Sequence, residues 1–195
     1  MPVAKGAILD PEQTRATILR AATRLLYQQG IDGIGVAGLC AAIGVSKETL
    51  YRHFGSKEGL VTAVLEARSD QVVRWLSDAA AAAGGDPAAQ LAAVFDALGR
   101  WYEEPTFRGC AVVNAATQHH AGPVRQIAAR HLDRHTGLFT GIARRAGARD
   151  PDGLGRQLLA LMEGATVLAD LRGDADAAET AKQAALALLR TSRGQ

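Results

Sequence analysis

Apolar residues recur along this chain every three or four positions, in segments separated by glycine, proline and helix-capping residues. The first segment starts at Asp10-Pro11, an N-cap followed by a proline suited to the first helical turn, and Gly30 ends it. The same signals predict nine helices, and no segment shows the alternation of a strand. The expected helices cover residues 11–30, 36–43, 47–53, 57–83, 87–103, 107–118, 122–146, 151–171 and 176–191.

Composition supports this pattern. Alanine supplies 39 of the 195 residues, and aromatic residues make up only 5%. Alanine is the best helix former and a poor strand former, so we expect an all-α fold. The length is sufficient for one or two domains with a real core.

Several functional classes are excluded at this stage. We expect no membrane span and no signal peptide, because polar residues interrupt every long apolar stretch and Met1–Asp10 lacks an apolar core. Cys40 and Cys110 fit no disulfide or CxxC spacing, so a cytoplasmic protein is predicted. No motif places a catalytic triad, a carboxylate pair or a phosphate-binding loop, so we expect no enzyme and no cofactor. The net charge of +2 argues against polybasic nucleic-acid binding but permits a local basic patch.

Residues 39–54 carry the strongest functional signal, because two short helices flank a three-residue turn, Gly44-Val45-Ser46. This is the helix-turn-helix arrangement, whose second helix enters the major groove of DNA. We expect Gly44 to adopt a positive φ and Ser46 to cap the second helix. An ordinary helical hairpin is the alternative. The side chains expected to contact bases or phosphates are Ser46, Lys47, Glu48, Thr49, Tyr51, Arg52, His53 and Lys57.

The segments Gly44–Lys47, Thr49–Phe54 and Ser56–Glu58 with Leu60, together with the preceding helix, resemble the TetR family of transcriptional regulators. The resemblance covers about residues 10–65. It implies a homodimer with a three-helix DNA-binding domain, a larger helical domain that binds a ligand, and repression relieved by a small molecule. On this basis residues 1–56 are expected to form the helix-turn-helix domain and residues 57–195 the ligand-binding and dimerisation domain.

Two positions depart from the usual family pattern. The first motif helix is preceded by Gly35, where the family typically carries a Ser or Thr cap. A glycine cap in place of serine lowers helix stability by only a few tenths of a kcal/mol. Cys40 stands where alanine is usual. We interpret Cys40 as a small buried side chain, with a redox switch as the alternative.

The C-terminal region is expected to supply both a dimer interface and a pocket. In proteins of this family the last two helices pair with those of a partner, although the same faces could be ordinary core. The expected interface residues are Leu154, Leu158, Leu161, Ala165, Leu168, Ala181, Ala185 and Leu188. The expected pocket residues, which could instead fill the core, are Trp75, Trp101, Tyr102, Phe107, Cys110, Asn114, Phe139 and Met162.

His131 and His135 share a helix face, but a zinc site needs three or four converging ligands and arginines surround this pair, so no metal is expected. The sequence therefore predicts a dimeric regulator, most simply a repressor released from a near-palindromic double-stranded operator by a small apolar molecule. The alternatives are an activator, a metal- or redox-responsive sensor of the same fold, or a helical ligand-binding module or enzyme in which the motif is vestigial.

Overall fold

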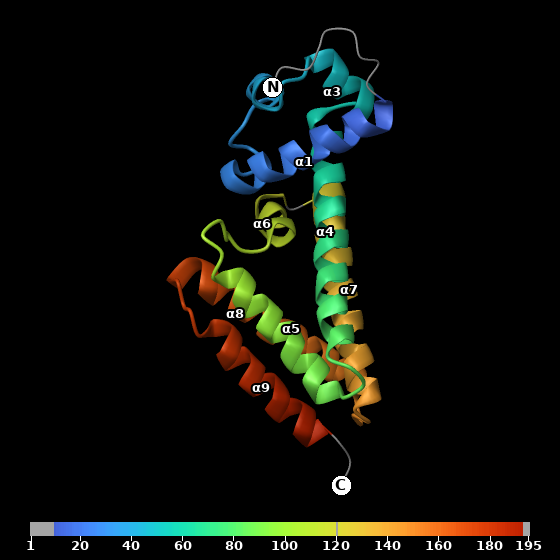
Figure 1. Cartoon of the computed structure of the whole chain (residues 1–195), viewed down its shortest axis with the longest axis vertical. Helices are drawn as coiled ribbons and strands as arrows, with labels where there is room; N and C mark the ends of the chain where they lie inside the picture. Colours follow the sequence, from blue (N-terminus) through green and yellow to red (C-terminus); the bar gives the residue numbers. More distant parts are fainter. Residues whose placement is uncertain (1–9, 120, 193–195) are drawn as a thin grey trace. The chain divides into compact units, whose positions relative to one another are not determined.

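The computed structural model describes residues 10–119 and 121–192, and this part of the chain forms nine helices and no strand (Figure 1). The all-α prediction is therefore confirmed. The helices are α1 Pro11–Gln29, α2 Val36–Ile43, α3 Lys47–Phe54, α4 Lys57–Ala82, α5 Pro87–Tyr102, α6 Ala111–Gln118, α7 Gly122–Arg145, α8 Pro151–Arg172 and α9 Ala177–Ser192.

The chain divides into two compact units, an N-terminal unit that ends at Arg68 and a C-terminal unit that begins at Ser69. The division lies inside α4, later than the boundary after residue 56 that the sequence suggested. The first turns of α4 belong with the N-terminal unit because their apolar residues, including Leu60 and Val64, are buried.

The N-terminal unit is a three-helix domain completed by the start of α4. Its fully buried side chains are Ile18, Ala22, Leu39, Leu50 and Leu60. The guanidinium of Arg15 lies 5.1 Å from the centre of the Phe54 ring, which adds a cation–π contact between α1 and α3.

Aspartates begin three of the helices as the sequence predicted. Asp10, Asp86 and Asp150 each accept a backbone N–H of the first helical turn. One helix start was wrong: α6 begins at Ala111, whereas a helix from residue 107 was expected. Gly109 has a φ of +70° there, a backbone conformation that breaks the helix, so residues 107–110 form a loop.

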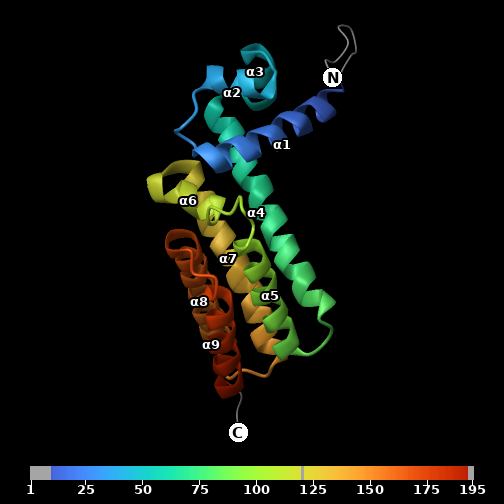
Figure 2. The ribbon, with the colours of Figure 1, turned by 60° about the vertical axis from the view of Figure 1, so that its left-hand side comes forward.

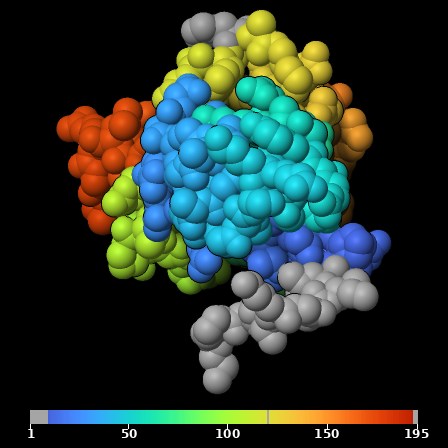
Figure 3. Space-filling model, turned by 90° about the horizontal axis from the view of Figure 1, so that it is seen from above, coloured from blue at the N-terminus to red at the C-terminus, as the bar shows by residue number. Residues whose placement is uncertain are grey.

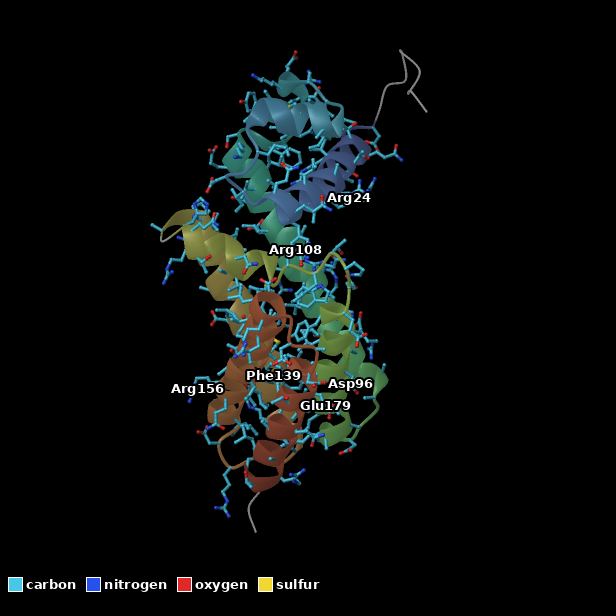
Figure 4. All side chains as sticks on the ribbon, turned by 90° about the vertical axis from the view of Figure 1, so that its left-hand side faces the viewer. Arg24, Asp96, Arg108, Phe139, Arg156 and Glu179 are labelled. Atoms are coloured by element: carbon cyan, nitrogen blue, oxygen red, sulfur yellow. The ribbon has the colours of Figure 1, made fainter. Side chains whose placement is uncertain are left out.

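The C-terminal unit packs α7 against α8, and α5 and α8 against α9 (Figure 2). Phe95 of α5 stacks on Phe139 of α7 with ring centres 6.1 Å apart, and both are fully buried. Figure 4 shows Phe139 among the helices of this unit. On its surface, Lys182 of α9 pairs with Asp96 of α5 at 2.7 Å and with Glu179.

A buried amide connects α5 with the end of α7. The Gln90 side chain is 8% exposed; its amide nitrogen donates to the Gly84 carbonyl, and its oxygen accepts two hydrogen bonds from Arg145, at 3.1 and 2.8 Å. All polar atoms of this buried amide are thereby engaged, which fixes the turn between α4 and α5.

The core of the C-terminal unit also holds two histidines on adjacent turns of α7. His131 and His135 are 0% and 2% exposed, and their ring centres lie 4.2 Å apart. Both ring nitrogens of His135 lack a hydrogen-bond partner among the described residues. Burial, and secondarily the His131 ring beside it, lower the pKa of His135 to about 3.

Across the described residues, none of the helices has the length and apolar character needed to span a membrane.

A close approach of α7 and α8 at Gly155 gives a first prediction. A Cβ added at Gly155 would overlap the Thr140 hydroxyl and would lie 3.1 Å from the Thr140 backbone nitrogen and 3.2 Å from the Thr136 carbonyl oxygen, so the two helices would have to separate. Gly155→Ala should lower the free energy of unfolding by about 1–3 kcal/mol, measured by urea denaturation. Gly137→Ala is the matched control: Gly137 lies in α7 with no atom near its added Cβ, and should gain up to about 1 kcal/mol from helix propensity. Equal stabilisation by both substitutions would contradict this packing.

The low pKa of His135 predicts acid sensitivity. The unfolded histidine binds a proton below about pH 6.5 but the folded one only near pH 3, so stability falls as the pH drops between these values. At pH 5 this loss amounts to about 2 kcal/mol. The His135→Leu variant should therefore lose about that much less stability than the wild type between pH 8 and pH 5, by urea denaturation at each pH. The difference in stability between the variant and the wild type at pH 8, where the imidazole is neutral, reports the packing cost of the substitution alone. Identical pH profiles for the two proteins would refute the assignment.

Candidate nucleic-acid interface and effector site

The turn between α2 and α3 has the geometry that the sequence predicted. Gly44 has a φ of +80°, a left-handed conformation that glycine adopts without strain. The backbone N–H groups of Gly44 and Val45 both donate to the Cys40 carbonyl, at 2.9 and 3.0 Å. The Ser46 hydroxyl then accepts the Thr49 N–H at 3.0 Å and caps α3. The turn therefore fixes the direction in which α3 leaves α2.

One face of α3 is available to a ligand. Leu50 is fully buried and anchors the helix, whereas Lys47, Glu48, Tyr51 and Arg52 are exposed. The Tyr51 side chain, 44% exposed, is one of few large apolar groups at the surface. Figure 3 shows the α2–α3 segment at the surface of its unit. Among the other predicted contact residues Ser46 is exposed, while Thr49, His53 and Lys57 are half-buried.

An ion pair already occupies part of this face. Arg52 donates to the Glu48 carboxylate at 2.7 Å, one helical turn away, and both side chains are largely exposed. Such an exposed pair contributes only about 0.3–0.5 kcal/mol, so a phosphate or a guanine edge can compete for the guanidinium.

Lys57 lies at the start of α4, directly after a tight turn. Gly55 has a φ of +74°, and the Ser56 hydroxyl accepts the Gly59 N–H at 3.0 Å. Lys57 is therefore the first residue of a capped helix, where open backbone N–H groups and a cation together suit a phosphate.

Both departures from the family pattern have a simple structural account. Gly35 caps α2 with extended backbone and no side-chain hydrogen bond. Cys40 is 5% exposed and has the place of a small core residue.

In the C-terminal unit, four of the predicted pocket residues form one aromatic cluster. The Trp101 ring lies 6.0 Å from Trp75, 5.8 Å from Tyr102 and 4.8 Å from Phe107, measured between ring centres. Trp101 and Phe107 are buried, whereas Trp75 and Tyr102 are half-buried. Cys110 follows this cluster in the loop before α6 and is 9% exposed.

Polar groups of α8 border the aromatic cluster. The Tyr102 hydroxyl hydrogen-bonds Thr166 at 2.8 Å, and burial raises the pKa of the phenol. Burial also raises the pKa of the nearby Glu163 carboxyl. The negative charge of Glu163 in turn adds to the rise in the pKa of Tyr102. The sequence reading missed Glu163, Thr166 and also Ser69. A signal existed: Ser69 and Thr166 are polar residues at helix positions where the apolar spacing places the core.

The remaining predicted pocket residues have other surroundings. Phe139 is stacked on Phe95 and fills the core. Asn114 is exposed, and its amide donates to the Arg108 carbonyl at 2.7 Å, which holds the loop before α6. Met162 is buried, and its carbonyl accepts the Thr166 hydroxyl.

The predicted dimer interface needs correction. Leu154, Leu158, Ala165, Ala181 and Ala185 are at most 5% exposed within a single chain, so they pack the core and present no surface to a partner. Leu168 is 39% exposed, and Leu161 and Leu188 are half-buried. The sequence shows a broad apolar face on each helix but cannot tell which part the chain itself covers.

No group of three or more potential metal ligands converges anywhere in the described ranges. His131 and His135 lie next to each other without the further ligands that a zinc site requires.

Comparison with known proteins covers both units. The family described as "Bacterial regulatory proteins, tetR family" matches residues 18–64, and the family described as "Tetracyclin repressor-like, C-terminal domain" matches residues 87–185. Curated relatives match over about a third of the chain. The chain is 34% identical over 58 residues to the transcriptional regulator TtgR of Pseudomonas putida, and 35% identical over 69 residues to the transcriptional activator FasR of Mycolicibacterium smegmatis. These alignments span only 28% and 32% of the two relatives.

Solved structures match over nearly the whole chain. A TetR-family transcriptional regulator from Streptomyces coelicolor has 31% identity and a TM-score of 0.81, with 94% of this chain and 97% of that one covered. A regulator of the same type from Streptomyces avermitilis has 32% identity and a TM-score of 0.78, with 92% and 97% covered. The chain belongs to the TetR family of transcriptional regulators, a family of DNA-binding proteins that are not enzymes.

Proposed function

We propose that this regulator is a homodimeric repressor that binds a near-palindromic operator through α3 and releases it when a small apolar molecule binds in the C-terminal unit. The observation that carries the proposal is the exposed face of α3, where Lys47, Tyr51 and Arg52 project from a helix anchored by Leu50 and capped by Ser46. Donors and an aromatic ring on such a face suit base edges and phosphates. The cytoplasm, where the DNA is, is its proposed place of action.

The aromatic cluster around Trp101 is the proposed effector region. Aromatic rings in edge-to-face contact and bordered by a few polar groups, such as the Tyr102 hydroxyl, are typical of sites for apolar small molecules. Activation in place of repression remains the second candidate, because FasR, one of the relatives, is described as an activator.

A different face of α8 is proposed for the dimer. Side chains exposed at helical spacing form an apolar stripe, hereafter the α8 stripe, of Ala160, Gly164, Val167, Leu168 and Leu171. Leu171 is 77% exposed and Val167 is 50% exposed, and a Cβ added at Gly164 would meet no atom of the chain. A second copy that packed its own stripe here would bury these side chains, with the small residues allowing close helix approach.

The DNA assignment is tested with a duplex recovered from random sequences by selection with the wild-type protein. Tyr51→Ala and Lys57→Ala together should weaken binding at least about tenfold, since they remove a base-reading ring and a phosphate contact. Lys57→Ala alone should also make the plot of the logarithm of the binding constant against the logarithm of the salt concentration less steep, by about 2 per dimer. Arg156→Ala removes one exposed cation from the C-terminal unit (Figure 4) and should leave both quantities unchanged. Unchanged binding by the double variant at moderate salt would show that α3 is not the recognition helix.

The dimer assignment is tested by sedimentation of the full chain. Val167→Asp with Leu171→Asp should weaken self-association roughly a hundredfold or more, because the dimer would have to bury four carboxylates, two from each partner. Both residues are exposed in the single chain, so circular dichroism should show an intact fold. Gln126→Asp on the exposed side of α7 is the control for added charge. A stable dimer of the double variant would place the interface elsewhere.

A further inference from the structure

Three polar side chains form a buried chain in the C-terminal unit, and one of them, Cys110, lies near the aromatic cluster. The Cys110 sulfur lies 3.4 Å from Nε2 of His131, and Nδ1 of the same ring lies 2.9 Å from the Ser69 hydroxyl. The three residues come from the start of α6, from α7 and from α4, and they are 9%, 0% and 4% exposed. A thiol is thus held against an imidazole that a third group orients.

Arg134 indicates the direction of these hydrogen bonds. Its guanidinium donates to the Ser69 oxygen at 3.3 Å and to the Asp70 carboxylate at 2.6 Å. The Ser69 oxygen can accept a second hydrogen bond, from Nδ1–H of His131. In that tautomer the lone pair of Nε2 faces Cys110 and can receive the thiol proton.

The position of Cys110 in the helix favours the same ionisation. Cys110 is the N-cap of α6, and its side chain makes no capping hydrogen bond. The first backbone N–H groups of a helix and its dipole stabilise a negative charge at this position. A sulfur beside both an imidazole and a helix N-terminus is the usual environment of a reactive thiolate.

His135 supplies a separate indication that a ligand approaches here. Its ring contacts that of His131, and both of its nitrogens lack a hydrogen-bond partner within the described part of the chain. A buried ring N–H without a partner is uncommon, and a carbonyl oxygen would satisfy it. Around Cys110 the nearby rings of Phe107 and Tyr102 make the surroundings largely apolar.

We propose that Cys110 is a covalent modification site for small α,β-unsaturated carbonyl compounds. The thiol proton passes to Nε2 of His131, and the thiolate forms a carbon–sulfur bond to the β-carbon of the acceptor. The carbon–carbon π bond breaks as that bond forms, and its electron pair moves toward the carbonyl oxygen, where the His135 N–H can stabilise it. The proton on His131 then passes to the α-carbon, so that S–H has added across the double bond with no oxidant or reductant.

The regulatory consequence rests on the function proposed above. An adduct on Cys110 adds atoms where α6 begins and where the hydrogen-bonded chain reaches Ser69 of α4. Because Cys110, His131 and Ser69 are all buried in the unmodified chain, we expect the adduct to displace these groups and to lower operator affinity.

The site itself is tested without DNA, with N-ethylmaleimide as the probe. Cys40 is an internal control, because it is buried to a similar degree but no imidazole of the described residues lies against its sulfur, as His131 lies against Cys110. Peptide mapping by mass spectrometry on the intact wild-type protein should find Cys110 alkylated at least about tenfold faster than Cys40. In denaturant the two rates should become equal. A native rate at Cys110 no faster than at Cys40 would overturn the proposal.

Two variants test the role of the imidazole. His131→Gln keeps an amide near the sulfur but cannot take its proton, so alkylation should slow at least about tenfold. Ser69→Ala leaves the imidazole in place but unoriented, and should slow alkylation a few-fold. Circular dichroism identifies the variants that fold. If His131→Gln does not fold, the Ser69→Ala rate decides, and a wild-type rate in any folded variant contradicts the mechanism.

A binding assay with the selected duplex separates this proposal from the proposed function. Alkylation of the wild type at Cys110 should weaken its binding at least about tenfold, while the same treatment of Cys110→Ala should leave that variant at its own untreated affinity. Equal affinity of treated and untreated wild type would overturn the regulatory consequence. Failure of the untreated protein to bind any duplex would overturn the proposed function. The reactivity of Cys110 would then be decided by the alkylation rates alone.

Discussion

Close approach of helices is the constraint on which this structure depends. With four phenylalanines, two tryptophans and three tyrosines in 195 residues, the core cannot be filled by large side chains held between distant helices. Backbones must instead meet directly, as α8 meets α7 at Gly155 and as α5 meets α9 where a Cβ on Gly99 would lie 3.3 Å from Ala178. Native packing density at these contacts requires small residues, and the alanine content supplies them.

The same constraint determines where chemistry is possible. In the N-terminal unit, small residues such as Ala22 and Cys40 let the helices close around Leu39 and Leu50, so the polar side of α3 is left outward. In the C-terminal unit, the few large rings gather at two places, the Phe95–Phe139 pair and the cluster around Trp101. The first is fully buried packing, whereas the second has polar groups at its border and half-buried members. That contrast makes the second the better candidate for a ligand.

Local signals in the sequence predicted most of the fold and the reading helix. The caps at Asp86, Asp150 and Ser46 and the left-handed Gly44 follow from chemistry within four residues, and the structure has each of them. The errors concern longer range. A helix was expected to start at residue 107, but residues 107–110 form a loop that is held by the Asn114 amide on the Arg108 carbonyl. Leu158 was expected in a dimer interface because it is apolar. Its apolar character does not reveal that the packing of α8 within the same chain already buries it.

Buried polar groups are the part of the site that was not predicted from the sequence, although Ser69 and Thr166 interrupt the apolar spacing of their helices. Ser69, His131 and Thr166 stand at core-facing positions, where apolar residues of similar size would pack without any hydrogen-bonding requirement. Each of these three has a partner, but His135 beside them has none among the described residues and tends to destabilise the fold in acid. An apolar side chain of similar size could fill this position without that cost in acid. A group that weakens the fold next to a thiol and its imidazole is better explained by what it can bind than by what it holds together.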